Sequence, residues 1–239
     1  MNNIILLTIC FLPCLFFLIY FYKEDKIEKE PFSLLIILFI CGIISSCLTV
    51  IISTILKSNI NFINLSYSDL NLIQIIIKVL FGIVLVEELI KWLFVYLISW
   101  KNKNFNYIFD AIVYCVFLSM GFAFLENIIY VHSFNNYEIR TMIVRSLISV
   151  PSHIVYSANM GYYLGLAKYY LINNDIKRAK KYKVLSLVIP IYFHLVYDLL
   201  LVSKNDFIFM FFIFYNLVTY YITYIKIKKL SSIKKYILI

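Results

Sequence analysis

Residues 85–92 read Leu-Val-Glu-Glu-Leu-Ile-Lys-Trp and place three charged side chains within five positions of a long apolar run. Ionisable side chains at membrane depth cost roughly 2.5 to 3.5 kcal/mol each on insertion scales, so they normally face a protein interior or a wet cavity and pair with one another. On a helix, Lys91 can pair with Glu87 four residues earlier or with Glu88 three residues earlier. One carboxylate is then left over. Two interpretations stay open, an ion pair that fixes helix packing and a catalytic site.

The composition is that of a membrane protein. The chain has 239 residues, of which 63% are hydrophobic and 15% charged, with a mean hydropathy of +0.88. We expect one continuous membrane domain over residues 1–239, with the motif-bearing core at about 73–203. The five cysteines lie in apolar runs and are odd in number, so a disulfide framework is not expected. The net charge of +9 is explained by lysines on the cytoplasmic side, so no nucleic-acid partner is expected.

Hydropathy predicts an all-α bundle of about seven membrane-spanning helices. The expected spans are 3–22, 32–56, 73–100, 107–131, 142–171, 184–202 and 207–227. The loops of such a bundle alternate between the two sides, and one set carries 15 Lys and Arg residues against 4 in the other. The positive-inside rule therefore predicts an external N-terminus and a cytoplasmic C-terminus. The first span lacks a basic leader and a small-residue cleavage site, so we expect it to be retained.

Four of the predicted spans carry polar side chains that hydropathy alone does not explain. These are Glu87, Glu88 and Lys91 on the third, Glu126 and Asn127 on the fourth, His153 on the fifth, and His194 and Asp198 on the sixth. At 1.5 Å per residue, Glu87, Glu126, His153 and His194 all lie about 9 to 14 Å below the outer surface. We therefore predict one site in the outer half of the membrane.

Two spacings bear on the roles of the histidines. Asp198 follows His194 by one helical turn and could orient its imidazole or share a metal with it. His153, Ser157, Gly161 and Gly165 recur every four residues, which is typical of a small-residue packing face. Helix packing therefore explains part of this stripe.

The ordered motifs of the chain resemble those of the PrsW family of bacterial intramembrane proteases. The motifs are EELIK at 87–91, GFAFLEN at 121–127, PSHIVYSANMGYYLG at 151–165, HLVYD at 194–198 and, earlier, DKIEKEP at 25–31. The resemblance, which extends more distantly to CAAX-type glutamate proteases, implies a multi-pass protease of the bacterial cell membrane. It also implies a single-span substrate, such as a membrane-anchored anti-sigma factor, cut on the outer side. The wider family often has a histidine where this chain has Glu126 and Asn127, and this chain ends its last motif with Asp198. These departures leave the metal question open.

Peptide hydrolysis needs an activated water, a group that stabilises the oxyanion and an acid for the leaving amine. We expect Glu87 or Glu88 to be the general base, with Glu87 favoured by the resemblance, and the other glutamate to pair with Lys91. His194, oriented by Asp198, would stabilise the oxyanion or act as the acid. Asn127 would be a further donor, and His153 and Glu126 would complete the pocket.

Other readings of the same residues stay open. In a metal-dependent version His153, His194 and Glu126, with Asp198 as a further candidate, would bind Zn²⁺. The residues could also serve a non-catalytic carrier, or a scaffold that only binds its client helix. A carrier needs a polar path across the bilayer, and we expect almost nothing polar in the inner half, with Lys91 as the innermost buried charge.

Overall fold

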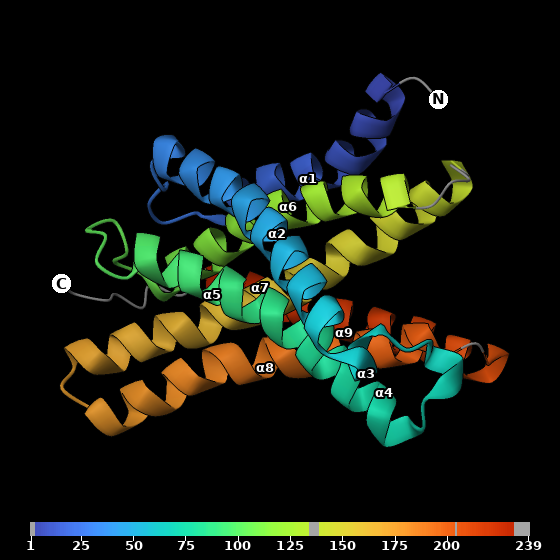
Figure 1. Cartoon of the computed structure of the whole chain (residues 1–239). Coiled ribbons are helices and arrows are strands. Elements are labelled where there is room, and N and C mark those ends of the chain that lie inside the picture. The colour runs from blue at the N-terminus through green and yellow to red at the C-terminus, as the bar shows by residue number, and fades with distance from the viewer. Residues whose placement is uncertain (1–2, 134–138, 204, 232–239) are drawn as a thin grey trace.

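The computed structural model describes residues 3–133, 139–203 and 205–231, and over these ranges the regular secondary structure is helical (Figure 1). The long helices are α1 (Asn3–Glu24), α2 (Phe32–Asn59), α6 (Ile108–Ser133), α7 (Ile139–Ile172), α8 (Ile176–Val202) and α9 (Asp206–Ser231). Short α3 (Asn61–Asn64) and the 3₁₀ turn η1 (Tyr67–Asp69) follow α2. The all-α prediction is confirmed.

The predicted span 73–100 forms one path of three helical pieces. These are α4 (Leu72–Val79), the π-helical turn η2 (Leu80–Val84) and α5 (Leu85–Ser99). Asn71 begins α4 with a capping box, in which its side chain accepts from the Gln74 N–H and Gln74 accepts from the Asn71 N–H. In η2 the Leu85 N–H bonds to the Leu80 carbonyl, five residues back, so the turn holds one residue more than an α-helical turn.

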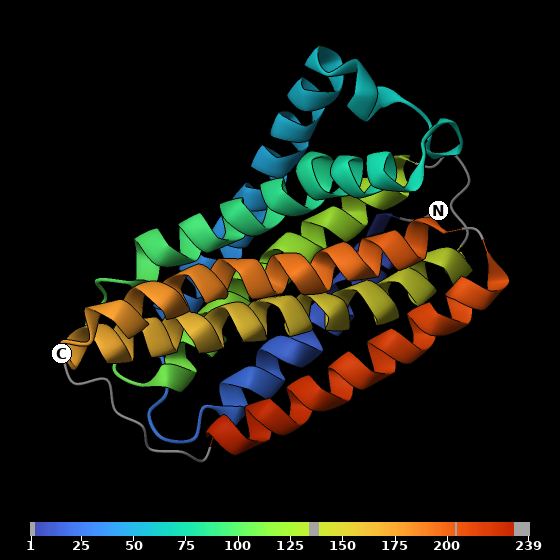
Figure 2. The same ribbon diagram turned by 90° about the horizontal axis from the view of Figure 1, so that it is seen from below.

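The long helices run alternately between two ends of the bundle. Figure 2 shows the segments 25–31, 100–107 and 173–175 at one end of the bundle, and at the other end the segment 60–71, the end of α8 and the start of α9. In the part of the chain that the structure describes, five helices are long and apolar enough to cross a membrane, with spans at Leu7–Glu24, Phe32–Asn59, Ile108–Val131, Ile176–Val202 and Asp206–Ser231. The multi-pass class is thereby supported, while seven spans and the orientation of the termini stay predictions.

Helix α6 is the core of the bundle, because every residue from 107 to 123 is buried. Glycines allow its neighbours to approach closely. A Cβ atom on Gly121 would lie 2.0 Å from the Phe39 carbonyl oxygen of α2, and one on Gly161 of α7 would lie 2.4 Å from the Ala111 carbonyl oxygen. The predicted packing role of the small-residue stripe is therefore confirmed at Gly161.

A group of buried polar residues lies at the end of the bundle that carries the basic loops. We call Asp25, Glu30, Asp110, Tyr114 and Lys168 the loop clamp, and each is 7% exposed or less. The expectation that Lys91 is the innermost buried charge is wrong. Asp110 of α6 and Lys168 of α7 are also buried, and they lie closer than Lys91 to the basic loops at the predicted cytoplasmic end. Hydropathy averages over a window and does not register single charges of this kind.

The loop clamp joins the first loop to α6 and α7. Tyr114 donates its hydroxyl to Glu30 at 2.5 Å, and the Glu30 N–H donates to Asp25 at 3.2 Å. Asp110 accepts from the N–H groups that begin α6, including that of Tyr107 at 2.6 Å, and Lys168 donates to the Phe105 carbonyl at 3.0 Å. These contacts hold the DKIEKEP loop against the bundle.

Candidate active site

Helix α5 places both glutamates of the EELIK motif and their lysine in the protein interior. Glu87 is 7% exposed, Glu88 1% and Lys91 2%. The Lys91 Nζ lies 2.7 Å from Glu88 Oε1 and 3.6 Å from Glu87 Oε2. The ammonium also lies 4.1 Å from the centre of the Phe122 ring of α6. Lys91 therefore pairs more closely with Glu88, and Glu87 is the carboxylate held less tightly.

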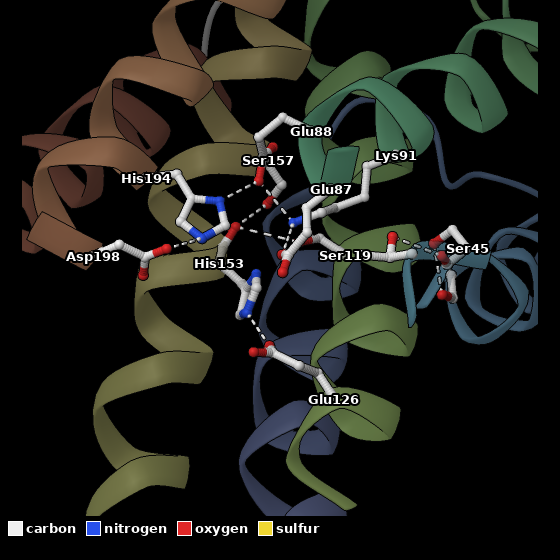
Figure 3. Close-up of polar contacts among 12 residues, drawn as sticks. Ser45, Glu87, Glu88, Lys91, Ser119, Glu126, His153, Ser157, His194 and Asp198 are labelled. Atoms are coloured by element: carbon white, nitrogen blue, oxygen red, sulfur yellow. Dashed lines mark hydrogen bonds and ion pairs between the residues drawn. The ribbon is translucent and has the colours of Figure 1, made fainter. Parts of the chain in front are cut away.

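His194 of α8 lies between two carboxylates. Its Nδ1 is 2.9 Å from Glu88 Oε1, and its Nε2 is 3.6 Å from Asp198 Oδ2 (Figure 3). The contact with Asp198 agrees with the spacing of one turn along α8, whereas the contact with Glu88 joins two helices and has no signal in the sequence. The imidazole is thus oriented from both sides.

Glu126 of α6 and His153 of α7 form the second half of the site. Glu126 Oε2 lies 2.8 Å from His153 Nε2, and the His153 ring centre lies 6.2 Å from that of His194. The two serines Ser119 and Ser157 donate to the His153 carbonyl, at 3.4 and 2.7 Å. Helices α5, α6, α7 and α8 therefore bring their predicted residues together.

We call the group so formed the acid–histidine cluster. Its members are Glu87, Glu88, Glu126, His153, His194 and Asp198. Asn127, predicted as a further donor, is 1% exposed and makes no hydrogen bond with any of them.

Two residues at the cluster were not predicted from the sequence. Tyr156 stacks on His194, with ring centres 4.6 Å apart and planes at 13°, and also meets His153 edge-on at 5.7 Å. Arg145 donates to Glu126 Oε1 at 2.7 Å. Both lie at helical spacings from His153 on α7, three residues after it and eight before it. That periodicity is a weak signal that could have found them.

The family assignment follows from a sequence comparison. Residues 30–225 match the family described as "PrsW family intramembrane metalloprotease". The chain belongs to the PrsW family. It is therefore a membrane-embedded protease, as the ordered motifs predicted.

Curated PrsW relatives agree in extent as well as in sequence. The chain is 33% identical to "Protease PrsW" of Geobacillus kaustophilus, a match covering 81% of this chain and 78% of the relative. It is 30% identical to "Protease PrsW" of Clostridioides difficile, over 96% and 93% of the two chains, and 28% identical to that of Bacillus subtilis, over 82% and 83%. No solved structure matches the chain. With its apolar helices and bacterial relatives, this PrsW-family chain is a multi-pass membrane protein.

Buried polar atoms without a hydrogen-bond partner gather at the PrsW motifs. Among the described residues these atoms are Glu87 Oε2, Glu88 Oε2, Asn127 Oδ1 and Nδ2, Arg145 Nε, His153 Nδ1, Tyr156 Oη, Tyr20 Oη and Asn106 Oδ1. Most buried polar groups in proteins are paired, and each unpaired one costs about 1–3 kcal/mol. Tyr20 and Asn106 are the two that lie away from the acid–histidine residues, and Asn106 donates its side-chain amide to Glu28 of the DKIEKEP motif at 3.0 Å. The site is therefore suited to a bound water, ion or substrate group.

The family description implies a metal, and the residues fit a divalent cation. One oxygen each of Glu87 and Glu88 and one nitrogen of His194 all lie within 4.8 Å of one another. Such a set of carboxylate and imidazole donors is one that Zn²⁺ takes. In addition, within the described residues the four carboxylates of the acid–histidine cluster have two permanent cations, Lys91 and Arg145, among their ion-pair partners, so a cation or protons could balance the remaining negative charge.

The metal ligands predicted from the sequence differ from the three residues whose donor atoms lie close together in the structure. His153 and Glu126 pair with each other through the 2.8 Å contact and are not part of the three-residue group, whereas His194 is. The assignment of His153, His194 and Glu126 as ligands stays a prediction.

Proposed function

We propose that the acid–histidine cluster is the active site of this PrsW-family protease and that it hydrolyses a peptide bond of a single-span membrane protein in the outer half of the bilayer. The observation that carries the proposal is the pair of buried, unpaired oxygens on Glu87 and Glu88, next to the oriented imidazole of His194. The resemblance of the motifs favours a membrane-anchored anti-sigma factor as the substrate.

The contacts suggest a different role for each glutamate. Glu87 is the general base, because its Oε2 accepts no hydrogen bond and lies 3.6 Å from Lys91. Glu88 is the positioning carboxylate, since its Oε1 accepts from Lys91 at 2.7 Å and contacts His194 at 2.9 Å. The two acids thus divide base and structural functions through their surroundings.

His194 stabilises the oxyanion or protonates the leaving amine. Glu88 and Asp198 hold its ring on either side, which fixes the direction of both ring nitrogens. Glu126 and His153 complete the pocket, and Asn127 supplies a further donor from α6.

Metal dependence is compatible with the same residues. Glu87, Glu88 and His194 would hold the ion, with His153, His194 and Glu126 as the alternative ligand set. A divalent metal bound there would supply Lewis-acid activation of a water.

Cleavage by purified protein tests the proposal. Wild type and Glu87→Gln, each reconstituted in nanodiscs, would be incubated with candidate anti-sigma factors and other single-span clients, and the cut site located by mass spectrometry. We expect the wild type to cut on the outer side and the variant to be inactive. Full cleavage by Glu87→Gln would remove the general-base assignment. Cleavage by neither protein would favour a binding scaffold.

Exhaustive chelation of the wild type, followed by addition of Zn²⁺, separates the two mechanisms. Loss of cleavage and its return with Zn²⁺ would establish the metal version. Undiminished cleavage after chelation would remove it.

A further inference from the structure

Glu126 is held between two side chains of α7. Its Oε1 accepts from Arg145 Nη2 at 2.7 Å, and its Oε2 lies 2.8 Å from His153 Nε2. Arg145 and His153 are eight residues apart, close to two helical turns, so both face α6. A single carboxylate therefore links the arginine to the histidine.

Arg145 is itself fixed by α6. Its guanidinium lies 3.7 Å from the centre of the Tyr130 ring, and Tyr130 follows Glu126 by four residues, one turn along the same helix face. Glu126 is the most exposed of the three side chains in this chain of contacts. Glu126 is 28% exposed and Arg145 17%, whereas His153 is 4% exposed. Glu126, which water can reach, thus depends on a neighbour to keep it directed at His153.

The contact between Glu126 and His153 determines which ring nitrogen carries the proton. A carboxylate only accepts, so His153 Nε2 carries hydrogen and donates to Glu126. In the neutral imidazole, Nδ1 then presents a lone pair, and this atom is buried with no hydrogen-bond partner. In Figure 3 it lies on the side of the ring turned toward Glu87.

We propose that Arg145 is a positioning residue that holds Glu126 against His153 and so keeps the lone pair of His153 Nδ1 directed into the acid–histidine cluster. Carboxylates that orient a catalytic or metal-bound imidazole act in this way, and loss of such a partner typically costs 10- to 100-fold in activity or metal affinity. The inference rests on the proposed function only for its effect on cleavage. The tautomer of His153 can be observed whether or not the protein cuts a substrate.

The test combines nitrogen NMR of isotope-labelled histidine with client cleavage. The chain has three histidines, so the spectrum is simple, and His153→Asn assigns the signal. In the wild type we expect one His153 tautomer, protonated at Nε2. In Arg145→Gln we expect a mixture of tautomers and cleavage slower by about 10- to 100-fold. Arg145→Lys, which keeps the charge without the planar fork, should keep the tautomer and recover part of the rate.

A double variant distinguishes positioning from a general packing role. If Arg145 acts through Glu126, then Arg145→Gln combined with Glu126→Gln should be no slower than Glu126→Gln alone. The matched control is Arg178→Gln, which removes an ion pair with Asp175 and a cation–π contact with Tyr170 at the other end of α7. This control should change neither the His153 signal nor the rate.

Each outcome decides the proposal. An unchanged His153 tautomer in Arg145→Gln, or rate losses that multiply in the double variant, would overturn it. If Arg145→Gln does not fold, Arg145→Met, which keeps much of the side-chain bulk without the charge, takes its place: a tautomer mixture would support the proposal and an unchanged tautomer would overturn it. If wild type cuts no client but Arg145→Gln still mixes the tautomers, the proposed function fails and the positioning role stands.

Discussion

The loop clamp and the acid–histidine cluster are both groups of buried charged residues, yet they differ in how fully their polar atoms are paired. Asp25, Glu30, Asp110 and Lys168 of the loop clamp each have a hydrogen-bond partner, and the unpaired buried atom beside them is the amide oxygen of Asn106. The acid–histidine cluster leaves oxygens of both α5 glutamates and Nδ1 of His153 unpaired.

This difference suits the loop clamp to stabilising the fold and the acid–histidine cluster to its proposed role in binding and catalysis. A satisfied buried network stabilises one arrangement of the backbone, whereas an unsatisfied one is costly unless a ligand completes it. Burial and charge alone would not have separated the two groups. Variants in each group can therefore be matched against one another.

The largest expected effect is that of Glu87→Gln. We expect client cleavage to fall about 10²- to 10⁴-fold, because a general base is lost. The melting temperature should change little, since Glu87 Oε2 accepts no hydrogen bond and Lys91 keeps Glu88. Cleavage assays and thermal unfolding in the same detergent would check this. Glu30→Gln in the loop clamp is the matched control and should keep its cleavage rate. If Glu87→Gln instead lost much stability and kept its cleavage rate, Glu87 would have a structural role like that of the loop-clamp residues.

Tyr114→Phe should show the opposite pattern. The substitution leaves Glu30 without its hydroxyl donor, so the free energy of unfolding should fall by about 1–3 kcal/mol. The cleavage rate of the folded protein should not change. Denaturant or thermal unfolding would measure the loss, with Tyr221→Phe, whose ring is 66% exposed, as the control. Slower cleavage with unchanged stability would show that Tyr114 contributes to catalysis and not to the stability of the fold.

A smaller effect is expected at Tyr156, which tests how the cluster holds His194. Tyr156→Leu removes the stacked ring and should slow cleavage by up to about tenfold, since an aromatic pair contributes about 0.5–1.5 kcal/mol. Tyr156→Phe keeps the stacking and should retain more of the rate. Steady-state kinetics of both variants would decide. If Tyr156→Phe is as slow as Tyr156→Leu, the unpaired hydroxyl matters rather than the ring.

The smallest expected effect is a pH dependence of stability that arises in the loop clamp. Burial, reinforced by the neighbouring carboxylates, raises the pKa of Glu30 to about 8, and burial raises that of Asp25 to about 6. The folded state therefore binds more protons than the unfolded state above about pH 4, so stability falls as the pH rises toward 8. The melting temperature should be several degrees higher at pH 5 than at pH 8, and Glu30→Gln should reduce this difference. A melting temperature that rises over the same range would contradict the assignment.

Hydropathy and loop charge predicted the seven long helical paths, most to within a few residues. The sixth path is the exception, because α8 begins at Ile176 rather than at 184. Its first two turns are basic and lie outside the predicted span, but the Asp175 side chain accepts from the Arg178 N–H and begins the helix there. In this segment the helix begins eight residues before the predicted membrane span, so hydropathy does not locate the start of the helix.

The structure brings the predicted residues of the acid–histidine cluster together, whereas most of the contacts among them were not predicted from the sequence. Spacing along α8 predicted the contact of His194 with Asp198, since both lie on one helix. Three other contacts depend on how each helix is rotated about its axis relative to its neighbours. They are the contact of His194 with Glu88, the ion pair of Arg145 with Glu126 and the stacking of Tyr156 on His194. A single sequence carries little information on that rotation, because apolar residues surround every helix of a membrane bundle.

The π-helical turn η2 makes the position of the α5 glutamates sensitive to the number of residues that precede them. Each residue of an α-helix turns the chain by about 100°. Removal of one residue between Leu80 and Val84 would leave hydropathy, charge and every motif intact. It would nevertheless swing Glu87 and Glu88 about a quarter of a revolution or more relative to α4, and it would alter η2 where Ser53 of α2 donates to the Gly82 carbonyl at 3.3 Å. The direction in which the glutamate side chains point thus depends partly on the number of residues in η2. Substitutions keep that number constant, so a substitution scan would not reveal this dependence.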